Sequence, residues 1–193
     1  MKTLIIATHN ARKVSELRPL LSRHVKLVSL SALQFDKDIP ETALTLEGNA
    51  LLKASFVHNT FNLDCFADDT GLEIVALGGK PGVFSARYAG QENNFEANVS
   101  KVLNELKDVE DRSARFRTVI CLIFNSKIHY FEGSIEGAIT KERSGNQGFG
   151  YDPVFIPDGY NLTFAEMSLE QKNTISHRAI ATTKLLEFLN KTY

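Results

Sequence analysis

Apolar residues recur first with the period of a strand and then with the period of a helix. No Ser/Pro-rich linker, repeat or low-complexity tract interrupts this alternation. Residues 3–7 predict a buried strand, and the segment after them predicts a helix that Asn10 caps and Pro19 kinks or ends early. Such alternation is typical of an α/β domain. With 193 residues, 1–193 has the length of one ordinary domain, drawn into two lobes.

A β-rich hairpin is expected in the second half of the chain. Residues 115–124 and 127–139 are rich in β-forming side chains, and Asn125-Ser126 separates them. The hairpin gives the sheet antiparallel character, so we expect a mixed sheet flanked by helices. The other expected elements are strands at 26–30 and 153–156, helices at 45–61, at 95–106 and from Leu169 to the C-terminus with a possible Ser168/Gln171 capping box, and loops at 31–40 and 78–82.

Two adjacent carboxylates, Asp68 and Asp69, stand between the apolar runs 65–67 and 72–76. This pattern predicts two short buried strands with an acidic break where the edge of the sheet opens to solvent. Neighbouring carboxylates repel one another, and a divalent cation with oxygen ligands relieves the repulsion. The competing interpretation is an ordinary surface turn, because Asp-Thr-Gly has good turn chemistry.

The segment from Thr8 to Lys13 falls between a predicted strand end and a predicted helix start. Free backbone N–H groups and the helix dipole favour an anion at such a place, and Lys13 adds a cation. A plain strand-to-helix loop with an Asn cap is the alternative. Neither the GxxxxGK[ST] phosphate loop nor the GxGxxG dinucleotide spacing is present in the chain.

Gly148 and Gly150 frame the aromatic residue Phe149, and Tyr151 directly precedes Asp152. Glycines let a backbone approach a ligand closely, Phe149 offers a flat face, and Asp152 can accept a hydrogen bond from a ring N–H. These features suit a purine pocket, although a tight loop with two packing aromatics has the same pattern. His177 and Arg178 on a helix, with Lys172 before them, would ordinarily form a solvated face.

Composition limits the possible partners. The formal charge of −1 leaves no basic field to attract nucleic acid, so any phosphate would be bound by a few placed cations. Cys65 and Cys121 lie in apolar runs without metal-type spacing, which favours reduced thiols and the cytoplasm. The N-terminal apolar run is too short for a signal peptide and no run approaches membrane length. We therefore expect a soluble protein without membrane or nucleic-acid partners.

Taken in order, these segments resemble the inosine triphosphate pyrophosphatase family. The chain departs from the family pattern at Ala43, where Gly is frequent, at Gly48, where Glu is frequent, and at Thr70, where many members have Ser. The matching segments are 7–10 with Lys13, Glu41-Thr42, 49–50 with Lys53, 67–73, 81–82, 85–90, 148–153, 164–167, 172–173 and 176–178.

The resemblance implies an elongated, two-lobed α/β fold with a substrate cleft between the lobes, usually as a homodimer. It implies hydrolysis of non-standard purine nucleoside triphosphates (ITP, dITP and XTP) to the monophosphate and pyrophosphate, which keeps them out of DNA and RNA. Asp69 is the implied general base, and Mg²⁺ would lie on Asp69 and Glu41, with Glu47 as the alternative to Glu41. The implied substrate-binding residues are Thr8, His9, Asn10, Ala11, Arg12, Lys13, Lys53 and Thr70 at the triphosphate, and Phe149, Gly150, Tyr151, Asp152, Lys172, His177 and Arg178 at the base.

Two other classes of function compete with this interpretation. A haloacid-dehalogenase-like phosphatase would release orthophosphate, but its aspartyl nucleophile belongs to an Asp-x-Asp motif after the first strand, and the adjacent Asp68 and Asp69 lie further along the chain. A nucleotide sensor without catalysis, or an RNA-binding sheet, would use Arg115, Phe116 and Arg117, although the balanced charge argues against it.

Overall fold

The structure is a computed structural model in which residues 2–21, 24–90 and 94–192 are described. The chain forms two compact units. Unit 1 contains Met1–Asp69, Thr118–Gly133 and Arg178–Tyr193, and unit 2 contains Thr70–Arg117 and Ser134–His177. Each unit has its own hydrophobic core, so each is described separately.

The strands form a seven-stranded mixed sheet in the order β2-β1-β3-β5-β6-β7, with β4 paired to β3. β1 pairs in parallel with β2 and β3, whereas β3–β4 and β6–β7 are antiparallel pairs. The expected mixed α/β sheet is therefore confirmed. The strands are β1 (Thr3–Ile6), β2 (Lys26–Ser29), β3 (Cys65–Ile74), β4 (Pro81–Gly82), β5 (Ser113–Phe124), β6 (Lys127–Ile139) and β7 (Phe155–Pro157).

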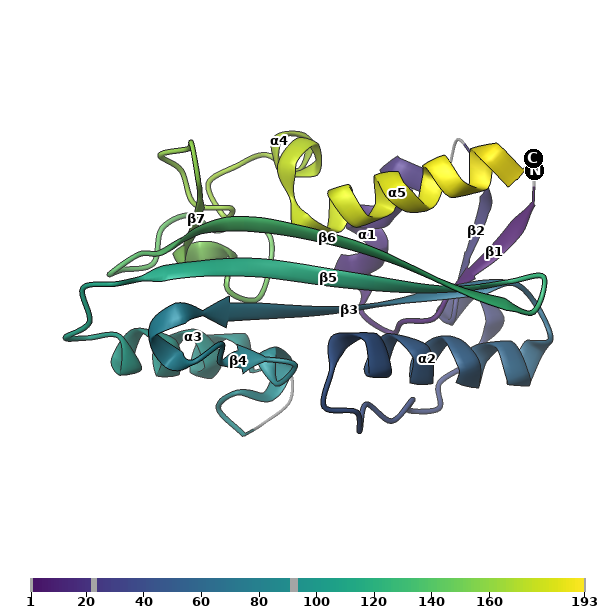
Figure 1. The fold of residues 1–193 in the computed structure, drawn as a ribbon, viewed down its shortest axis with the longest axis horizontal. Helices are drawn as coiled ribbons and strands as arrows, with labels where there is room; N and C mark the ends of the chain where they lie inside the picture. The colour runs from purple at the N-terminus through teal and green to yellow at the C-terminus, as the bar shows by residue number, and fades with distance from the viewer. Residues whose placement is uncertain (1, 22–23, 91–93, 193) are drawn as a thin grey trace. The chain divides into compact units, whose positions relative to one another are not determined.

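In unit 1 the apolar side chains of the sheet divide between its two faces, as the alternation of a strand requires. Leu4 and Ile6 pack with α1 (Ala11–Leu21) and α5 (His177–Thr192). Ile5 and Ala7 pack instead with α2 (Leu46–Phe61). Figure 1 shows α5 along one face of these strands and α2 along the other. Both faces are covered, which accounts for the nearly continuous apolar sequence of β1.

Unit 2 packs its core around aromatic rings. Phe116, Phe155 and Phe164 are buried together, with ring centroids of Phe116 and Phe155 4.7 Å apart. Helix α3 (Phe95–Glu105), whose N-cap is Asn94, contributes Val99 to this core. The short helix α4 (Leu169–Ile175) begins at Ser168 with the expected capping box to Gln171. Since Phe116 is buried, it offers no exposed stacking surface of the kind an RNA-binding sheet uses.

The prediction of two strands separated by an acidic break at Asp68 and Asp69 is wrong. β3 runs without interruption from Cys65 to Ile74, and both carboxylates are buried within it. The alternative of a surface turn is wrong for the same reason. Charged residues lie inside this strand because cations from neighbouring elements pair with each of them, a long-range contact that local hydrophobicity does not reveal.

Four smaller predictions need correction in whole or in part. The C-terminal helix expected from Leu169 is divided at Ser176, whose extended backbone separates α4 from α5. Pro19 lies inside α1, which runs to Leu21, so an end of the helix at Pro19 is wrong, while a kink there stays a prediction. The expected strand at 153–156 begins only at Phe155, after a 3-10 turn, and the expected loop at 78–82 contains β4.

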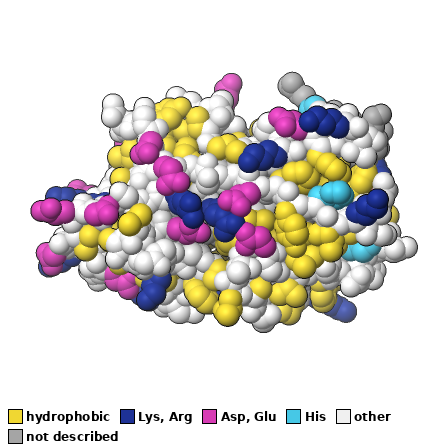
Figure 2. Space-filling model, in the orientation of Figure 1, with side chains coloured by type: hydrophobic (Ala, Val, Ile, Leu, Met, Phe, Trp, Pro, Cys, Tyr) yellow, Lys and Arg dark blue, Asp and Glu magenta, His cyan; other side chains and the backbone are white. Residues whose placement is uncertain are grey.

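The surface is mixed in charge. On the face drawn in Figure 2, Lys and Arg side chains are interspersed with Asp and Glu, which agrees with the formal charge of −1. Within the described part of the chain, no helix is both long enough and apolar enough to cross a membrane.

Candidate active site

The turn between β1 and α1 is held by its own side chains. Asn10 Oδ1 accepts hydrogen bonds from the backbone N–H groups of Arg12 and Lys13 at 3.0 and 3.3 Å. Thr8 Oγ1 accepts from the Asn10 N–H at 3.1 Å. The expected Asn cap is thus confirmed, while the binding of a phosphate at this helix start, next to Ala11, stays a prediction.

Lys13 and Arg178 converge on Asp68. Lys13 Nζ lies 3.0 Å from Asp68 Oδ2, and Arg178 Nε lies 3.3 Å from the same oxygen. Glu16, which is buried in α1, accepts a hydrogen bond from Arg178 Nη1. Burial raises the pKa of Asp68, but the charges of Lys13, Arg178 and Lys53 outweigh it and hold that pKa well below its ordinary value. Asp68 is therefore an ionised anchor for the two cations.

Lys53 of α2 joins the other two acidic candidates. Its Nζ lies 2.7 Å from Glu41 Oε1 and 3.2 Å from Asp69 Oδ1. Burial lowers the pKa of Lys53, but the carboxylates of Asp69 and Glu41 outweigh it and raise that pKa above its ordinary value. Burial raises the pKa of Asp69, and the nearby Lys53 only partly opposes this. Asp68 and Asp69 therefore have opposite pKa shifts although they are neighbours in sequence.

Glu41 and Asp69 are compatible with Mg²⁺. Their oxygens both lie within reach of a single cation, the Lys53 ammonium. Among the described residues no group of three or more His, Cys, Asp and Glu side chains gathers into a metal site. Mg²⁺ typically binds through one or two carboxylates together with water and substrate phosphates, so this pair suffices.

The absence of a carboxylate at position 48 has a steric explanation. A Cβ on Gly48 would lie 2.6 Å from the Cβ of Ala43 and 3.1 Å from Oγ1 of Thr45, the N-cap of α2. The methyl group of Ala43 therefore occupies the space that a side chain at 48 needs. The two departures from the family pattern, at 43 and at 48, thus lie in direct steric contact.

The residues expected at the base lie mostly in unit 2. Lys172 Nζ lies 2.7 Å from Asp152 Oδ2, and the Phe149 N–H donates to the same oxygen at 2.8 Å. The Lys172 ammonium also stands 5.4 Å from the ring centroids of Phe149 and of Phe164. At Gly148, whose φ is +71°, a Cβ would approach Asp152 Oδ2 to 2.0 Å, so only glycine fits there.

Four other predicted residues have distinct surroundings. Tyr151 is buried, and its hydroxyl donates to the Ser85 carbonyl at 2.8 Å. His177 is buried with its ring stacked on Phe116, 4.6 Å between centroids. Gly150 has a positive φ of +65°, and Thr70 is half-buried in β3.

Arg178 is the one residue implied at the base that lies outside unit 2. It belongs to unit 1, where Glu16 and Asp68 hold its guanidinium. These contacts use Nε and Nη1 of the guanidinium, and a contact between Arg178 and the base stays a prediction. The resemblance implies its place at the base but does not show which way the side chain turns.

His9 also has a structural partner. Its ring is stacked on Phe35 at 6.1 Å between centroids, and its Nε2 lies 2.9 Å from the Lys37 carbonyl oxygen. These contacts tie the turn after β1 to the segment that leads to Glu41. A contact between His9 and substrate stays a prediction.

Sequence reasoning missed Asn49 and Glu16 as members of the site. Asn49 Nδ2 donates to Asp69 Oδ2 at 3.3 Å, and Glu16 pairs with Arg178. A signal for Asn49 was present, because a spacing of four residues puts it on the same face of the helix as Lys53. Glu16 had no such signal in the sequence.

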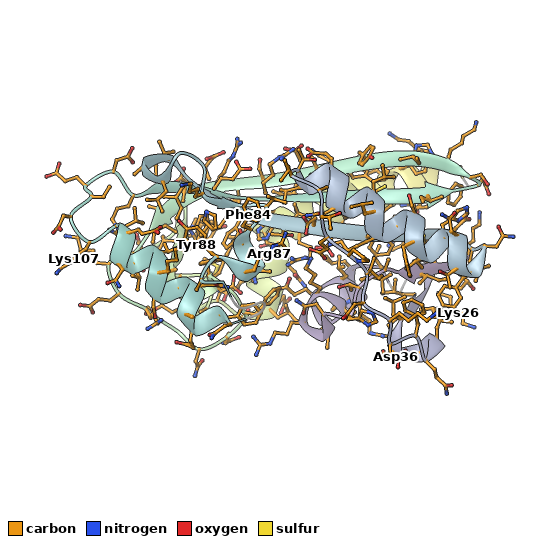
Figure 3. The ribbon with its side chains drawn as sticks, turned by 90° about the horizontal axis from the view of Figure 1, so that it is seen from below. Lys26, Asp36, Phe84, Arg87, Tyr88 and Lys107 are labelled. Atoms are coloured by element: carbon orange, nitrogen blue, oxygen red, sulfur yellow. The ribbon has the colours of Figure 1, made fainter. Side chains whose placement is uncertain are left out.

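A separate pocket of about 370 Å³ lies in unit 2. Phe84, Arg87 and Tyr88, which line it, lie close together in Figure 3. Lys101 Nζ donates to the Tyr88 carbonyl at 2.8 Å, and the Tyr88 hydroxyl donates to Glu105. None of the predicted site residues lines this pocket, which is lined by Lys80, Pro81, Phe84, Arg87, Tyr88, Lys101 and Glu105.

The fold and the site define an α/β protein in which buried carboxylates of β3 pair with lysine and arginine side chains from the helices around the parallel strands β1, β2 and β3. A family model described as the Ham1 family matches residues 4–188, and the chain belongs to this family.

Similar proteins agree with this assignment. A dITP/XTP pyrophosphatase of Porphyromonas gingivalis is 56% identical over 190 residues, which are 98% of this chain and 98% of that protein. A dITP/XTP pyrophosphatase of Bacillus subtilis is 46% identical over 193 residues, with 98% of each chain covered. The solved structure of the Staphylococcus aureus Ham1 protein matches with a TM-score of 0.89 at 38% identity and covers 100% of both chains. The resemblance found in the sequence is thus confirmed.

Proposed function

We propose that this protein hydrolyses dITP, XTP and ITP to the nucleoside monophosphate and pyrophosphate with the help of Mg²⁺. The observation that carries the proposal is the cluster around Asp69, in which a buried carboxylate of raised pKa lies beside Lys53, Glu41 and Asn49. The relatives named dITP/XTP pyrophosphatase supply the substrate class.

Unit 1 supplies the groups for the triphosphate. Lys13 and Lys53 are cations held in place by buried carboxylates, and the start of α1 adds backbone N–H groups. Phosphoryl chemistry depends mainly on positioning and on neutralising charge, which such fixed cations provide. Glu41 and Asp69 would hold Mg²⁺, which when bound neutralises charge on the phosphate oxygens.

Asp69 is proposed as the general base. Water would attack so that the bond between the α- and β-phosphates breaks, its proton passes to Asp69, and pyrophosphate leaves. A carboxylate is a better base when its pKa is raised toward neutral pH, and burial raises the pKa of Asp69. Asp68 cannot share this task, because its cationic partners hold its pKa low.

Unit 2 supplies the groups for the base. Phe149 would stack on the purine ring, and the pair of Lys172 and Asp152 offers a donor beside an acceptor. Hypoxanthine and xanthine present an oxo group and a ring N–H, which match this pair. Adenine presents an amino group and a bare ring nitrogen, so donor faces donor and acceptor faces acceptor. A mismatch of this kind discriminates by about 10⁴-fold or more.

We also propose that the protein is a homodimer that acts on free nucleotides in the cytoplasm. Support for the compartment comes from Cys65 and Cys121, which are free and buried. Burial raises the pKa of the Cys65 thiol to about 12 and that of Cys121 to about 11, so both stay protonated and unreactive. Light scattering of the purified protein measures the oligomeric state.

The test is a panel of nucleoside triphosphates with Mg²⁺, scored for both pyrophosphate and orthophosphate. We expect pyrophosphate from dITP, XTP and ITP and a much lower kcat/KM for ATP. Release of orthophosphate would indicate a phosphatase instead. Equal use of ATP and ITP would contradict the substrate class, and absence of any product would contradict the assignment as an enzyme.

A further inference from the structure

Asn49 connects the two segments that carry the acidic candidates for metal binding. It lies in α2 and is completely buried. Its Oδ1 accepts a hydrogen bond from the Ala43 N–H at 2.9 Å, and its Nδ2 donates to Asp69 Oδ2 at 3.3 Å. Ala43 follows Glu41 by two positions, so the carboxamide fastens the segment of Glu41 to Asp69.

A carboxamide suits this position because it is both a donor and an acceptor. A carboxylate at 49 could accept from Ala43 but has no donor for Asp69, and it would add a like charge. An apolar side chain of the same shape would leave the N–H of half-buried Ala43 and a carboxylate oxygen of buried Asp69 without these bonds. The contacts of Asn49 therefore specify its chemistry and not only its size.

Lys53, one turn further along α2, also contacts Asp69 and reaches the side chain of Glu41 directly. Its ammonium is bonded to both Glu41 and Asp69. Lys53 carries a positive charge that attracts a phosphate. Asn49 is neutral, and both its Oδ1 and its Nδ2 are hydrogen-bonded within the protein. Asn49 thus holds the carboxylates in place without competing with them for a cation.

We infer that Asn49 is a positioning residue that fixes the separation and orientation of Glu41 and Asp69 for a divalent cation. The inference rests on the proposed function, in which these two carboxylates bind Mg²⁺. Residues that hydrogen-bond to metal ligands orient them, and loss of such a residue lowers metal affinity.

Unit 2 offers a matched control in Asn98, which is as deeply buried as Asn49. Asn98 Oδ1 accepts from the Ala89 N–H at 2.7 Å, and its Nδ2 donates to the carbonyls of Ser85 and Ala86 at 3.3 and 3.1 Å. Like Asn49, it links a loop to a helix, but its Nδ2 donates to neutral backbone carbonyls and not to a carboxylate. A purely structural role for Asn49 would make the two residues equivalent in every assay of metal binding.

The first experiment measures Mn²⁺ binding by electron paramagnetic resonance, with and without a non-hydrolysable ITP analogue. Asn49→Leu, or Asn49→Ala if the larger side chain prevents folding, should weaken Mn²⁺ binding by about 10- to 100-fold. Asn98→Leu should bind Mn²⁺ within about twofold of the wild-type affinity, even if it loses as much thermal stability as the Asn49 variant does. The inference is overturned if a folded Asn49 variant binds Mn²⁺ as tightly as the wild type.

The second experiment uses the wild type alone and so does not depend on a variant that folds. Nuclear magnetic resonance follows the side-chain NH₂ signals of Asn49 and Asn98 during addition of Mg²⁺. The Asn49 signals should shift as the site fills, and those of Asn98 should not. Binding of Mg²⁺ without any shift at Asn49 would contradict the inference. If the wild type binds neither Mg²⁺ nor Mn²⁺, even with the analogue, the metal requirement of the proposed function fails as well.

Discussion

The two units bury their polar groups in different ways. In unit 1, the three cations Lys13, Arg178 and Lys53 form ion pairs with four carboxylates, those of Asp68, Asp69, Glu41 and Glu16. In unit 2, the buried pair of Lys172 and Asp152 stands against the rings of Phe149 and Phe164. The first arrangement suits a polyanion, and the second suits a flat ring with a few hydrogen-bonding edges.

The difference has a thermodynamic side. Burying a charge costs free energy that an ion pair only partly returns, so a cluster of buried charges is weak evidence for stability. Burial lowers the pKa of Lys13 even though Asp68 opposes this, which means that its charge is incompletely compensated. An arriving phosphate would supply the missing negative charge. Unit 1 is therefore arranged for an anion at some expense of stability.

The largest expected effect is that of Asp69→Asn. The substitution keeps the shape but removes the charge that accepts a proton, so kcat should fall by about 10²- to 10⁴-fold. Circular dichroism checks that the fold is retained. Asp64→Asn is the control, because Asp64 directly precedes β3 and pairs with Lys2. Activity of Asp69→Asn within a few fold of the wild type would contradict the assignment of the base.

Asp68→Asn should affect stability more than any substitution at the base-binding residues. Removing one partner from a buried ion pair typically costs about 3 to 5 kcal/mol, and here Lys13 loses its charged partner while Arg178 keeps only Glu16. Urea unfolding of wild type and variant at neutral pH measures the difference in the free energy of unfolding.

The pH dependence distinguishes Asp68 from Asp69. The folded pKa of Asp68 is depressed, so its contribution to stability is fully present above its unfolded pKa of about 3.9 and is lost as pH falls toward the folded pKa. The stability gap between wild type and Asp68→Asn should therefore narrow below about pH 4. The folded pKa of Asp69 is raised, so the stability of Asp69→Asn relative to the wild type should increase as pH rises through it. The same trend for both variants would contradict the opposite shifts.

Lys13→Ala tests whether unit 1 binds the phosphates. Loss of a fixed cation next to an anion should cost about 1.5 to 3 kcal/mol in kcat/KM. Tripolyphosphate has no base, so its inhibition constant should rise in Lys13→Ala to a similar extent. Unchanged inhibition by tripolyphosphate would show that the turn after β1 is only a helix cap.

Phe149→Ala applies the same logic to unit 2. Loss of a stacked aromatic ring should weaken nucleotide binding by about 1 to 3 kcal/mol while tripolyphosphate inhibits as in the wild type. The ratio of kcat/KM for ITP and ATP should change little, because all purines have similar faces. Lys172→Met should reduce that ratio instead. A large change in the ratio for Phe149→Ala would show that the ring does more than stack.

Local patterns in the sequence were sufficient for most of the elements. The hairpin of β5 and β6, the helix expected at 45–61 and the capping box at Ser168 all follow from residues within a few positions. The continuity of β3 through Asp68 and Asp69 could not be predicted in the same way, since it depends on Lys13, Lys53 and Arg178, which are distant in sequence.

The sequence predicted which residues belong to the site better than it predicted the contacts between them. Lys13, Lys53 and Asp69 do meet in unit 1, as the motifs implied. The direction of Arg178 was not predictable, because the two partners that hold it come from β3 and from Glu16 in α1. A sequence motif can therefore indicate which residues belong to the site, but the contacts of each side chain depend on residues that are distant in sequence.

The smallest expected effect comes from Gly48, where unit 1 is packed most tightly around its candidate acids. In Gly48→Ala the new methyl group would stand 2.6 Å from the Cβ of Ala43, and overpacking of this kind costs about 1 to 3 kcal/mol. Alanine favours a helix over glycine by up to about 1 kcal/mol, which offsets part of that cost. The net loss in unfolding free energy should therefore be about 0.5 to 2 kcal/mol.

The double variant Ala43→Gly with Gly48→Ala identifies the cause of that loss. Removing the Ala43 methyl reopens the space, so the double variant should be more stable than Gly48→Ala, although Ala43→Gly alone should be destabilising because a flexible glycine raises the entropy of the unfolded chain. The interaction energy from this double-mutant cycle should be favourable and at least about 0.5 kcal/mol. Additive effects would mean that the two positions are independent. The coupling also predicts that Mn²⁺ affinity changes in Gly48→Ala, because the Ala43 N–H binds Asn49, and recovers in the double variant.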